Sequence, residues 1–182
     1  MHRIVTAVFF SALLIMTSCG ESREDKLAKI KDLEGRLLAD STKAKDEVAA
    51  YNLQVAYTDF QEKFPEDELS SEYLFKAADL GINMGWGESS IKILEKFISL
   101  YPDNKRTPEA LFYIAYVYDN IENDDVKAGE NYRAFLQKYP DHAFAESAQS
   151  SIQALGKSDE ELIREFEEKM KADSLAADSL TS

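Results

Sequence analysis

An aromatic residue followed by proline occurs three times at nearly constant spacing, and this feature constrains the fold most. The pairs are Phe64-Pro65, Tyr101-Pro102 and Tyr139-Pro140, so 37 residues separate the first two prolines and 38 separate the last two. Because proline pushes the preceding residue out of the α region, each pair predicts the end of a helix. A period of roughly 20–50 residues is typical of arrays in which each unit buries its apolar face on the next. The pattern therefore predicts an all-α chain of stacked helical hairpins, an α-solenoid of about seven helices.

The composition agrees with a helical array that has a packed core. The chain has 182 residues, of which 45% are hydrophobic and 11% aromatic, and it contains 7 Gly and 4 Pro. These values argue against wholesale disorder and against a loop-rich β protein. The formal net charge of −13 opposes binding of nucleic acid, because phosphate binding needs clustered Lys and Arg.

Residues 1–18 are interpreted as a signal peptide. A short basic start precedes an apolar run from Ile4 to Met16, which is too short to span a membrane as a helix. The run ends in Thr17-Ser18-Cys19-Gly20, and Cys19 is the single cysteine, so no intramolecular disulfide is possible. Small residues before a lone Cys resemble the lipobox of bacterial lipoproteins, although Met16 stands where Leu is usual. The resemblance implies cleavage before Cys19 and lipidation of Cys19; an ordinary signal peptide with an incidental Cys is the alternative.

Residues 19–25 are interpreted as a lipidated tether. Gly20, rather than Asp, follows the Cys, and by resemblance to lipoprotein sorting signals this favours the outer membrane. The acidic residues that follow resemble a surface-export signal weakly, and a solvated linker is the alternative. The helical domain is expected over residues 26–171, and residues 172–182, which repeat Ala-Asp-Ser-Leu, are expected to form a disordered tail.

Apolar residues spaced by three and four predict the helices. Ser70 or Ser71 and Thr107 are expected as N-caps, Pro108 follows Thr107, and Gly156 ends the third unit. Ser158 and Glu161 form a capping-box pattern that opens a final capping helix with an apolar stripe of Leu162, Ile163, Phe166 and Met170. The expected helices span about residues 23–39, 43–63, 70–84, 89–100, 107–119, 126–138, 145–155 and 158–171.

Within these helices, certain apolar positions are expected to face the core. The second helix carries Val48, Tyr51, Val55 and Phe60 as its apolar positions. Phe97 and Phe135 are expected to be buried between adjacent units. Small residues of the third helix, Ala77, Ala78 and Gly81, would let two helices approach closely.

One unit resembles a tetratricopeptide repeat (TPR). Its frame of large, small and aromatic residues is Leu111, Ala115, Tyr118, Ala128, Tyr132, Phe135 and Pro140, and the preceding unit has Leu74, Ala78, Gly81, Ser90, Leu94, Phe97 and Pro102. Gly81 and Ser90 depart from the expected aromatic residue and Ala, and the later unit has one extra residue between its helices. The Tyr-Pro endings also resemble periplasmic TPR lipoproteins of gram-negative bacteria, such as those of outer-membrane assembly or the Tol–Pal system.

The sequence contains no pattern typical of an enzyme, a metal centre or a cofactor site. His142 follows the third proline and is interpreted as a surface or capping residue. The chain has no His cluster, no Cys–His pair in the mature part and no glycine loop for phosphate. Trp86 lies between two glycines, and it is interpreted as packing over helix ends, with an exposed recognition role as the alternative. We therefore expect a protein that is not an enzyme.

The TPR resemblance implies a groove lined by the first helix of each hairpin. The positions that carry over are Glu72, Phe75, Asp79, Glu109, Phe112, Tyr116 and Asp119, followed by Gln149 and Gln153. Aromatic residues flanked by carboxylates would suit a peptide with apolar anchors and nearby Lys or Arg. The alternative is that Phe75 and Phe112 face a neighbouring helix instead.

Taken together, these patterns predict a lipid-anchored TPR scaffold or adaptor that binds a protein or peptide partner in the cell envelope. The expected location is the outer membrane, facing the periplasm. One alternative is a lipoprotein that captures a small ligand or glycan at the cell surface. Another is a structural homo-oligomer built through the helix containing Leu27 to Leu37. The sequence leaves the partner, the leaflet and the oligomeric state open.

Overall fold

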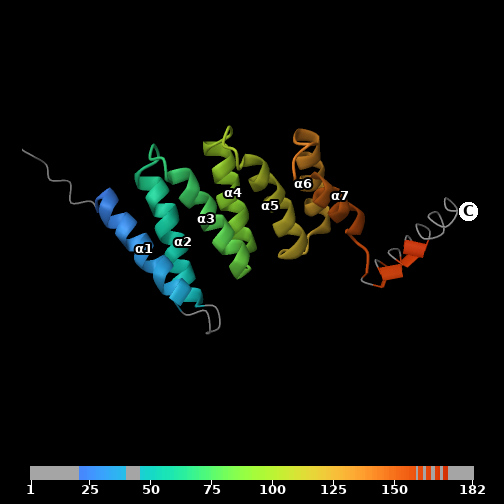
Figure 1. The fold of residues 1–182 in the computed structure, drawn as a ribbon, viewed down its shortest axis with the longest axis horizontal. Helices are drawn as coiled ribbons and strands as arrows, with labels where there is room; N and C mark the ends of the chain where they lie inside the picture. Colours follow the sequence, from blue (N-terminus) through green and yellow to red (C-terminus); the bar gives the residue numbers. More distant parts are fainter. Residues whose placement is uncertain are drawn as a thin grey trace, which may run out of the picture.

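The computed structural model describes residues 21–39 and 46–158, together with residues 160, 161, 163, 164, 167, 168, 170 and 171. Its described helices stand side by side in a row with α1 and α7 at opposite ends (Figure 1). Each packs mainly on its neighbours in the sequence, and no strand occurs in this part of the chain. The helices are α1 (Arg23–Ala39), α2 (Glu47–Lys63), α3 (Ser70–Met84), α4 (Gly87–Leu100), α5 (Thr107–Asn120), α6 (Asp125–Lys138) and α7 (Ala145–Ala154). The predicted all-α solenoid of helical hairpins is confirmed.

The three aromatic–proline turns have nearly the same backbone geometry. Phe64, Tyr101 and Tyr139 are the C-caps of α2, α4 and α6, with φ/ψ of −130°/59°, −128°/58° and −136°/60°. These turns lie along one edge of the row, the same edge at which α1 begins (Figure 1). The repeat predicted from the prolines is therefore a structural repeat.

A side chain three residues after each aromatic residue holds the turn. Asp67 and Asn104 accept a hydrogen bond from the backbone N–H two residues further on, at 3.0 Å and 2.9 Å. His142 does the same through Nδ1, which accepts from the Phe144 N–H at 3.2 Å. Three different residue types thus make one turn. His142 therefore holds the turn and does not cap α7, whose N-cap is Phe144 with no side-chain cap bond.

Ser70 and Thr107 are not the N-caps that the sequence predicted. Each is the first residue of its helix, and the N-caps of α3 and α5 are Leu69 and Arg106, which make no side-chain cap bond. The Thr107 hydroxyl instead donates to the Tyr101 carbonyl at 2.7 Å, and Ser70 donates to the equivalent carbonyl of Phe64. Both hydroxyls therefore join the end of one hairpin to the start of the next, and neither is free to cap the helix that it begins.

The remaining helix boundaries agree with expectation within a few residues. α1 begins and ends where predicted, whereas α2 begins at Glu47 behind an Asp46 cap, and the positions from 43 to 45 lie outside the described residues. α4 begins two residues early, at Gly87, because the left-handed Gly85 (φ 78°) ends α3 at once, and only Gly85 and Trp86 separate the two helices.

The predicted capping box at the C-terminal end is present, but the predicted packing of its helix is not. The Ser158 N–H donates to Glu161 at 2.9 Å, and the Glu161 N–H donates to the Ser158 hydroxyl at 3.3 Å. Ile163 and Met170 are nevertheless 58% and 56% exposed, so this part of the apolar stripe does not cover the array. Leu162 and Phe166 lie outside the described residues, as do the predicted signal peptide, Cys19 and the tail.

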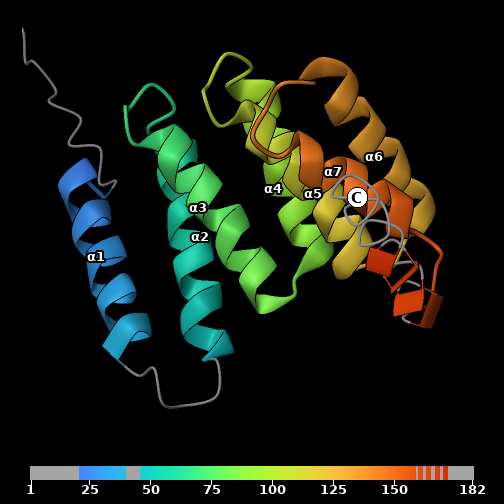
Figure 2. The ribbon, with the colours of Figure 1, turned by 45° about the vertical axis from the view of Figure 1, so that its right-hand side comes forward.

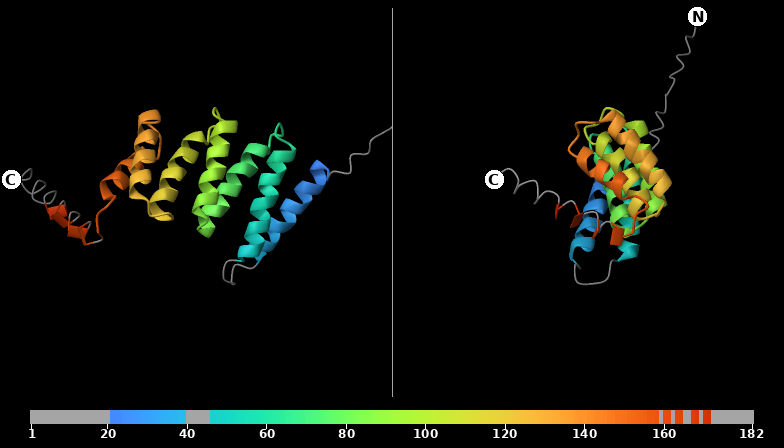
Figure 3. Two further views of the ribbon diagram at one scale, coloured as in Figure 1. Left: turned by 180° about the vertical axis from the view of Figure 1, so that it is seen from behind. Right: turned by 90° about the vertical axis from the view of Figure 1, so that its right-hand side faces the viewer.

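The core consists of three clusters that follow one another along the row. The first joins α1, α2 and α3, the second α3, α4 and α5, and the third α5, α6 and α7. Ile93 packs on the first two clusters and Tyr113 on the last two, so adjacent units stabilise one another. Phe97 and Phe135 are fully buried, as expected. Figure 2 and the two views of Figure 3 show how closely the successive hairpins are stacked.

α2 turns a different face to the core than the sequence predicted. Val48, Tyr51 and Val55 are 71%, 59% and 44% exposed, and of the four expected positions Phe60 alone is buried. The buried face carries Ala50, Leu53, Gln54, Ala56, Tyr57, Phe60 and Gln61. Both faces of α2 are rich in apolar residues, and the one chosen has the small Ala residues that let α1 and α3 approach.

α1 closes the first end of the array. Ile30 is 1% exposed, and Leu27, Leu33 and Leu37 pack on the same cluster. Arg23 pairs with Asp67, and the outward positions of α1 are polar. Ile30 and these three leucines thus pack largely within the chain, and the homo-oligomer that the sequence suggested through this helix stays a prediction. None of the described helices is both long enough and apolar enough to cross a membrane.

Candidate functional site

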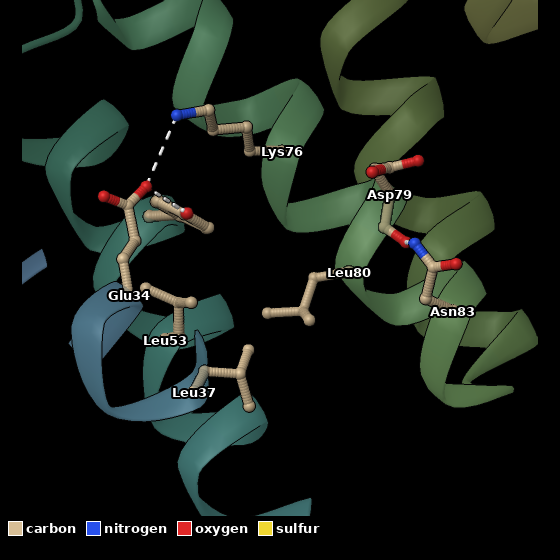
Figure 4. Close-up of a pocket in the computed structure, with 8 residues that line it drawn as sticks. Glu34, Leu37, Leu53, Lys76, Asp79, Leu80 and Asn83 are labelled. Carbon is tan, nitrogen blue, oxygen red and sulfur yellow. Dashed lines mark hydrogen bonds and ion pairs between the residues drawn. The ribbon is translucent and has the colours of Figure 1, made fainter. Parts of the chain in front are cut away.

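An open pocket of about 390 Å³ lies where α1, α2 and α3 meet. Leu37, Leu53 and Leu80 come from these three helices and point toward one another (Figure 4). Glu34 and Lys76 lie on one side of the three leucines, and Asp79 and Asn83 on the other. The pocket thus combines an apolar floor with polar groups at its sides, as ligand sites in proteins do.

One side of the pocket is fixed by a small polar network. The Tyr57 hydroxyl donates to Glu34 Oε1 at 2.6 Å, and Lys76 Nζ lies 3.3 Å from the same oxygen. The Tyr57 ring stacks on Tyr73, with centroids 5.3 Å apart, and the Lys76 ammonium lies over both rings. α1, α2 and α3 each contribute to this network, so it holds the walls of the pocket in place.

The network also sets the charge of its members. Burial raises the pKa of Tyr57, and the adjacent Glu34 carboxylate raises it further. Burial disfavours the charged form of Lys76, but Glu34 and Glu72 outweigh it and hold the pKa of this ammonium above its usual value. At neutral pH, Tyr57 is therefore a neutral phenol and Lys76 is an ammonium.

The other side of the pocket carries a carboxylate that remains available. Asp79 is exposed, and the described residues offer it no ion pair. The Asn83 side chain donates back to the Asp79 carbonyl at 2.9 Å, which fixes the amide beside the pocket. A cationic group on a bound molecule would therefore meet an uncompensated negative charge next to the leucines.

The predicted groove residue Phe75 lies in the core and does not line a groove. It is 0% exposed, and its ring packs edge-on against Phe97 with centroids 5.2 Å apart. The guanidinium of Arg106 covers it, with Cζ 3.4 Å from the ring centroid. The sequence-based alternative, in which this side chain faces neighbouring helices, is correct.

The same correction applies to Phe112 in the next unit. It is 9% exposed and lies among Tyr132, Phe135 and Phe144, whose ring centroids are 5.5 Å, 5.7 Å and 4.7 Å away. The assignment of Phe112 to the groove was wrong because α5 is apolar around most of its circumference. The repeat frame alone therefore did not decide which aromatic residue of α5 faces outward.

The acidic members of the predicted groove have three different settings. Glu72 is exposed and contacts Lys76 at 3.4 Å, whereas Glu109 accepts a hydrogen bond from Arg106 at 2.9 Å. Asp119 accepts from the hydroxyl of the buried Tyr132 at 3.1 Å. Burial is the main cause that raises the pKa of Tyr132 to about 12; Ser151 lowers it, and the Asp119 carboxylate raises it. The only predicted groove residue that joins the α1–α3 pocket is therefore Asp79. Outside the pocket, the predicted groove positions that remain exposed are Glu72, Tyr116, Gln149 and Gln153.

Sequence analysis missed most of the pocket. Leu37 entered the sequence analysis only through the helix suggested for a homo-oligomer, and Leu80 was not singled out, because no sequence pattern indicates which apolar residues border an opening. Charge pairing across helices, such as Glu34 with Lys76, depends on a separation of 42 positions that no local pattern contains.

The kinds of side chain in the described residues indicate what the pocket can bind. No group of three or more His, Cys, Asp or Glu in this part of the chain could hold a metal ion. The α1–α3 pocket contains neither a Cys nor a His. Its arrangement can bind an apolar group and a cation.

A comparison with protein-family models supports a TPR assignment for one unit of the array. The sequence model of the tetratricopeptide repeat family matches residues 109–142, the unit formed by α5, α6 and the third proline turn. Among solved structures, the chain is similar to a Podospora anserina protein described as a kinesin light chain with nearly identical TPR-like repeats. The identity is 11%, the TM-score is 0.47, and the match covers 87% of this chain and 90% of that one. A search of curated proteins gave no match.

Proposed function

We propose that this protein is a non-catalytic TPR scaffold that holds a protein partner in the α1–α3 pocket. The TPR architecture supports this, because such repeats generally mediate contacts between proteins. The observation that carries the proposal is the cluster of Leu37, Leu53 and Leu80 in an open pocket beside the unpaired Asp79.

The pocket's chemistry suits a peptide segment with one aliphatic side chain and a Lys or Arg. Burying a Leu or Ile side chain among the leucines would contribute roughly 1.5–3 kcal/mol. The cation would face Asp79 and fix the register of the segment more than it would add affinity. An open, leucine-lined pocket suits a side chain of a longer partner better than the capture of a glycan, which would call for aromatic stacking surfaces.

Replacing Leu80 by Ser is expected to weaken partner binding about tenfold or more, because the pocket loses a third of its apolar floor. Partners would be captured by a photocrosslinker at Asn83, beside the pocket, and their yield compared between the native chain and Leu80→Ser. Val126→Ser, which alters a side chain that is 71% exposed on α6, serves as the matched control. Equal capture by all three chains, with unchanged circular dichroism, would show that the partner binds elsewhere.

We further propose that the scaffold is anchored by lipid at Cys19, on the outer membrane and facing the periplasm. The support is the resemblance of residues 1–20 to a lipoprotein signal and the Gly that follows the Cys. Two or three acyl chains would anchor the chain stably, at roughly 0.8 kcal/mol per buried CH₂. The partner would then be a component of the cell envelope.

Cys19→Ser should abolish this anchoring, leaving the protein either soluble or uncleaved in the inner membrane. Fractionation of envelopes, with metabolic labelling by a fatty-acid analogue, would measure it. Ser18→Ala, a small-for-small change at the adjacent position, should leave labelling and location unchanged. If Cys19→Ser still fractionates with the outer membrane, the lipoprotein assignment is wrong.

A further inference from the structure

A stripe of exposed apolar side chains follows the outer surface of α2. Val48, Tyr51 and Val55, called here the α2 stripe, are 71%, 59% and 44% exposed. The core already uses the opposite face of this helix, so the fold does not need these side chains. Single exposed apolar residues are ordinary, but three on one side of one helix indicate an interaction surface.

The spacing of the α2 stripe fits a helix as its partner. Steps of three and four residues place Val48, Tyr51 and Val55 along one seam with a 3.5-residue period, the period of helix–helix packing. Thr58 follows Val55 by three residues and continues the seam. Its hydroxyl donates to the backbone carbonyls of Gln54 and Val55, at 3.2 Å and 3.1 Å, so the hydroxyl needs no partner from a docked helix. From Val48 to Thr58 the seam is about 15 Å long.

An aromatic pair widens one end of the stripe. Trp86, the N-cap of α4, is half-buried, and its ring meets Tyr51 at 73° with centroids 6.4 Å apart. Tyr and Trp are the residues that most often dominate the binding energy of protein interfaces. A docked helix would therefore touch both α2 and α4, which gives this end of the seam its own shape.

A second copy of the chain fits the α2 stripe poorly. Three exposed side chains and part of Trp86 make a narrow surface, which suits a single helix better than the broad face of a second array. The formal net charge of −13 adds repulsion between copies. Both considerations favour a different protein that meets the stripe through one helix.

The charges beside the stripe indicate a cationic partner. Asp59 and Glu62 are neutralised by Lys26 and Lys96. At the start of α2, Asp46 caps the helix by accepting from the Ala49 N–H at 3.0 Å, and Glu47 precedes Val48; both are exposed and neither has an ion pair among the described residues. The formal net charge of −13 acts in the same direction. We propose that the α2 stripe docks an amphipathic helix of a partner protein whose apolar residues recur every three to four positions and are flanked by Lys or Arg.

Two synthetic helices test this proposal. Each is about three heptads long with Leu at positions a and d; one has Lys at e and g, and its twin has Glu there. Both would be titrated into the isotopically labelled chain from Gly20 to Ser182, since every described contact lies at or after residue 21. The Lys helix should shift the amide NMR signals of residues 48–58 and Trp86, and the Glu helix should bind about tenfold more weakly or less.

Matched variants separate this surface from the α1–α3 pocket and from general attraction of a cation to an acidic protein. Tyr51→Ser with Val55→Ser should weaken the Lys helix about tenfold, whereas Leu80→Ser and Val126→Ser should not. Shifts confined to the pocket, or equal binding by the twin helices, would overturn the proposal. The proposal would also be wrong if sedimentation showed that the native chain is a dimer and that Tyr51→Ser is a monomer. The same holds if the Lys helix bound only after removal of residues 172–182.

Discussion

Phe112→Ala is expected to lower the free energy of unfolding by about 3–5 kcal/mol, the usual cost of removing a buried Phe. The side chain is 9% exposed and contacts the rings of Tyr132, Phe135 and Phe144 from two other elements. Its loss leaves a cavity at the junction of α5, α6 and α7. Because repeats stabilise only their neighbours, the weakened junction should also shift the unfolding of the adjacent hairpins. Urea unfolding followed by circular dichroism would measure the change.

Tyr116→Ala is the matched control on the same helix, one turn further along. Tyr116 is 38% exposed, so its removal should cost less than about 1 kcal/mol. The pair distinguishes the two sequence-based interpretations of these aromatic residues, groove or core. If both variants unfold at the native urea concentration, Phe112 is not in the core, and the register of α5 described here is incorrect.

The fold could be predicted because the signals that end its helices are local in the sequence. Proline fixes where each second helix ends, and Phe64, Tyr101 and Tyr139 adopt the same backbone conformation before it. The unit that contains the regular frame, from Leu111 to Pro140, is also the one that the TPR family model matches. Signals confined to a few neighbouring residues are therefore sufficient for the number and order of the hairpins.

The candidate site could not be predicted, because it depends on which face of each helix turns inward. α2 and α5 are apolar on more than one side, and hydrophobic spacing alone fits either side. Val55 and Phe112 were assigned to the wrong environments for this reason. The choice is made by close packing between helices, where small residues such as Ala56 and Gly81 allow one face to approach and bulky ones do not.

Gly81 shows how strictly that packing is set. A Cβ at this position would lie 2.4 Å from Ser90 Oγ and 2.7 Å from Gln54 Nε2. Both neighbours are buried, and both are hydrogen-bonded: Gln54 Nε2 donates to the Ala77 carbonyl at 2.9 Å, and Ser90 Oγ donates to the Trp86 carbonyl at 2.8 Å. Neither the Gln54 nor the Ser90 side chain can move away without breaking its hydrogen bond. α3 can therefore lie between α2 and α4 only because residue 81 lacks a side chain.

Gly81→Ala is therefore expected to destabilise the protein by about 1–3 kcal/mol, although Ala favours a helix by about 1 kcal/mol over Gly. Gly35→Ala, in α1, should have the opposite sign and stabilise by about 0.5–1 kcal/mol, because no atom lies within 4 Å of its new Cβ. Adding Ser90→Ala to Gly81→Ala should recover part of the loss, since it removes the nearest clashing atom while the Ser90 N–H still bonds the Trp86 carbonyl at 3.0 Å. Thermal and urea unfolding of the four chains would give the signs directly. Equal stabilisation by both Gly→Ala changes would mean that α3 does not approach α2 and α4 as closely as described, and the geometry of the α1–α3 pocket would have to be revised with it.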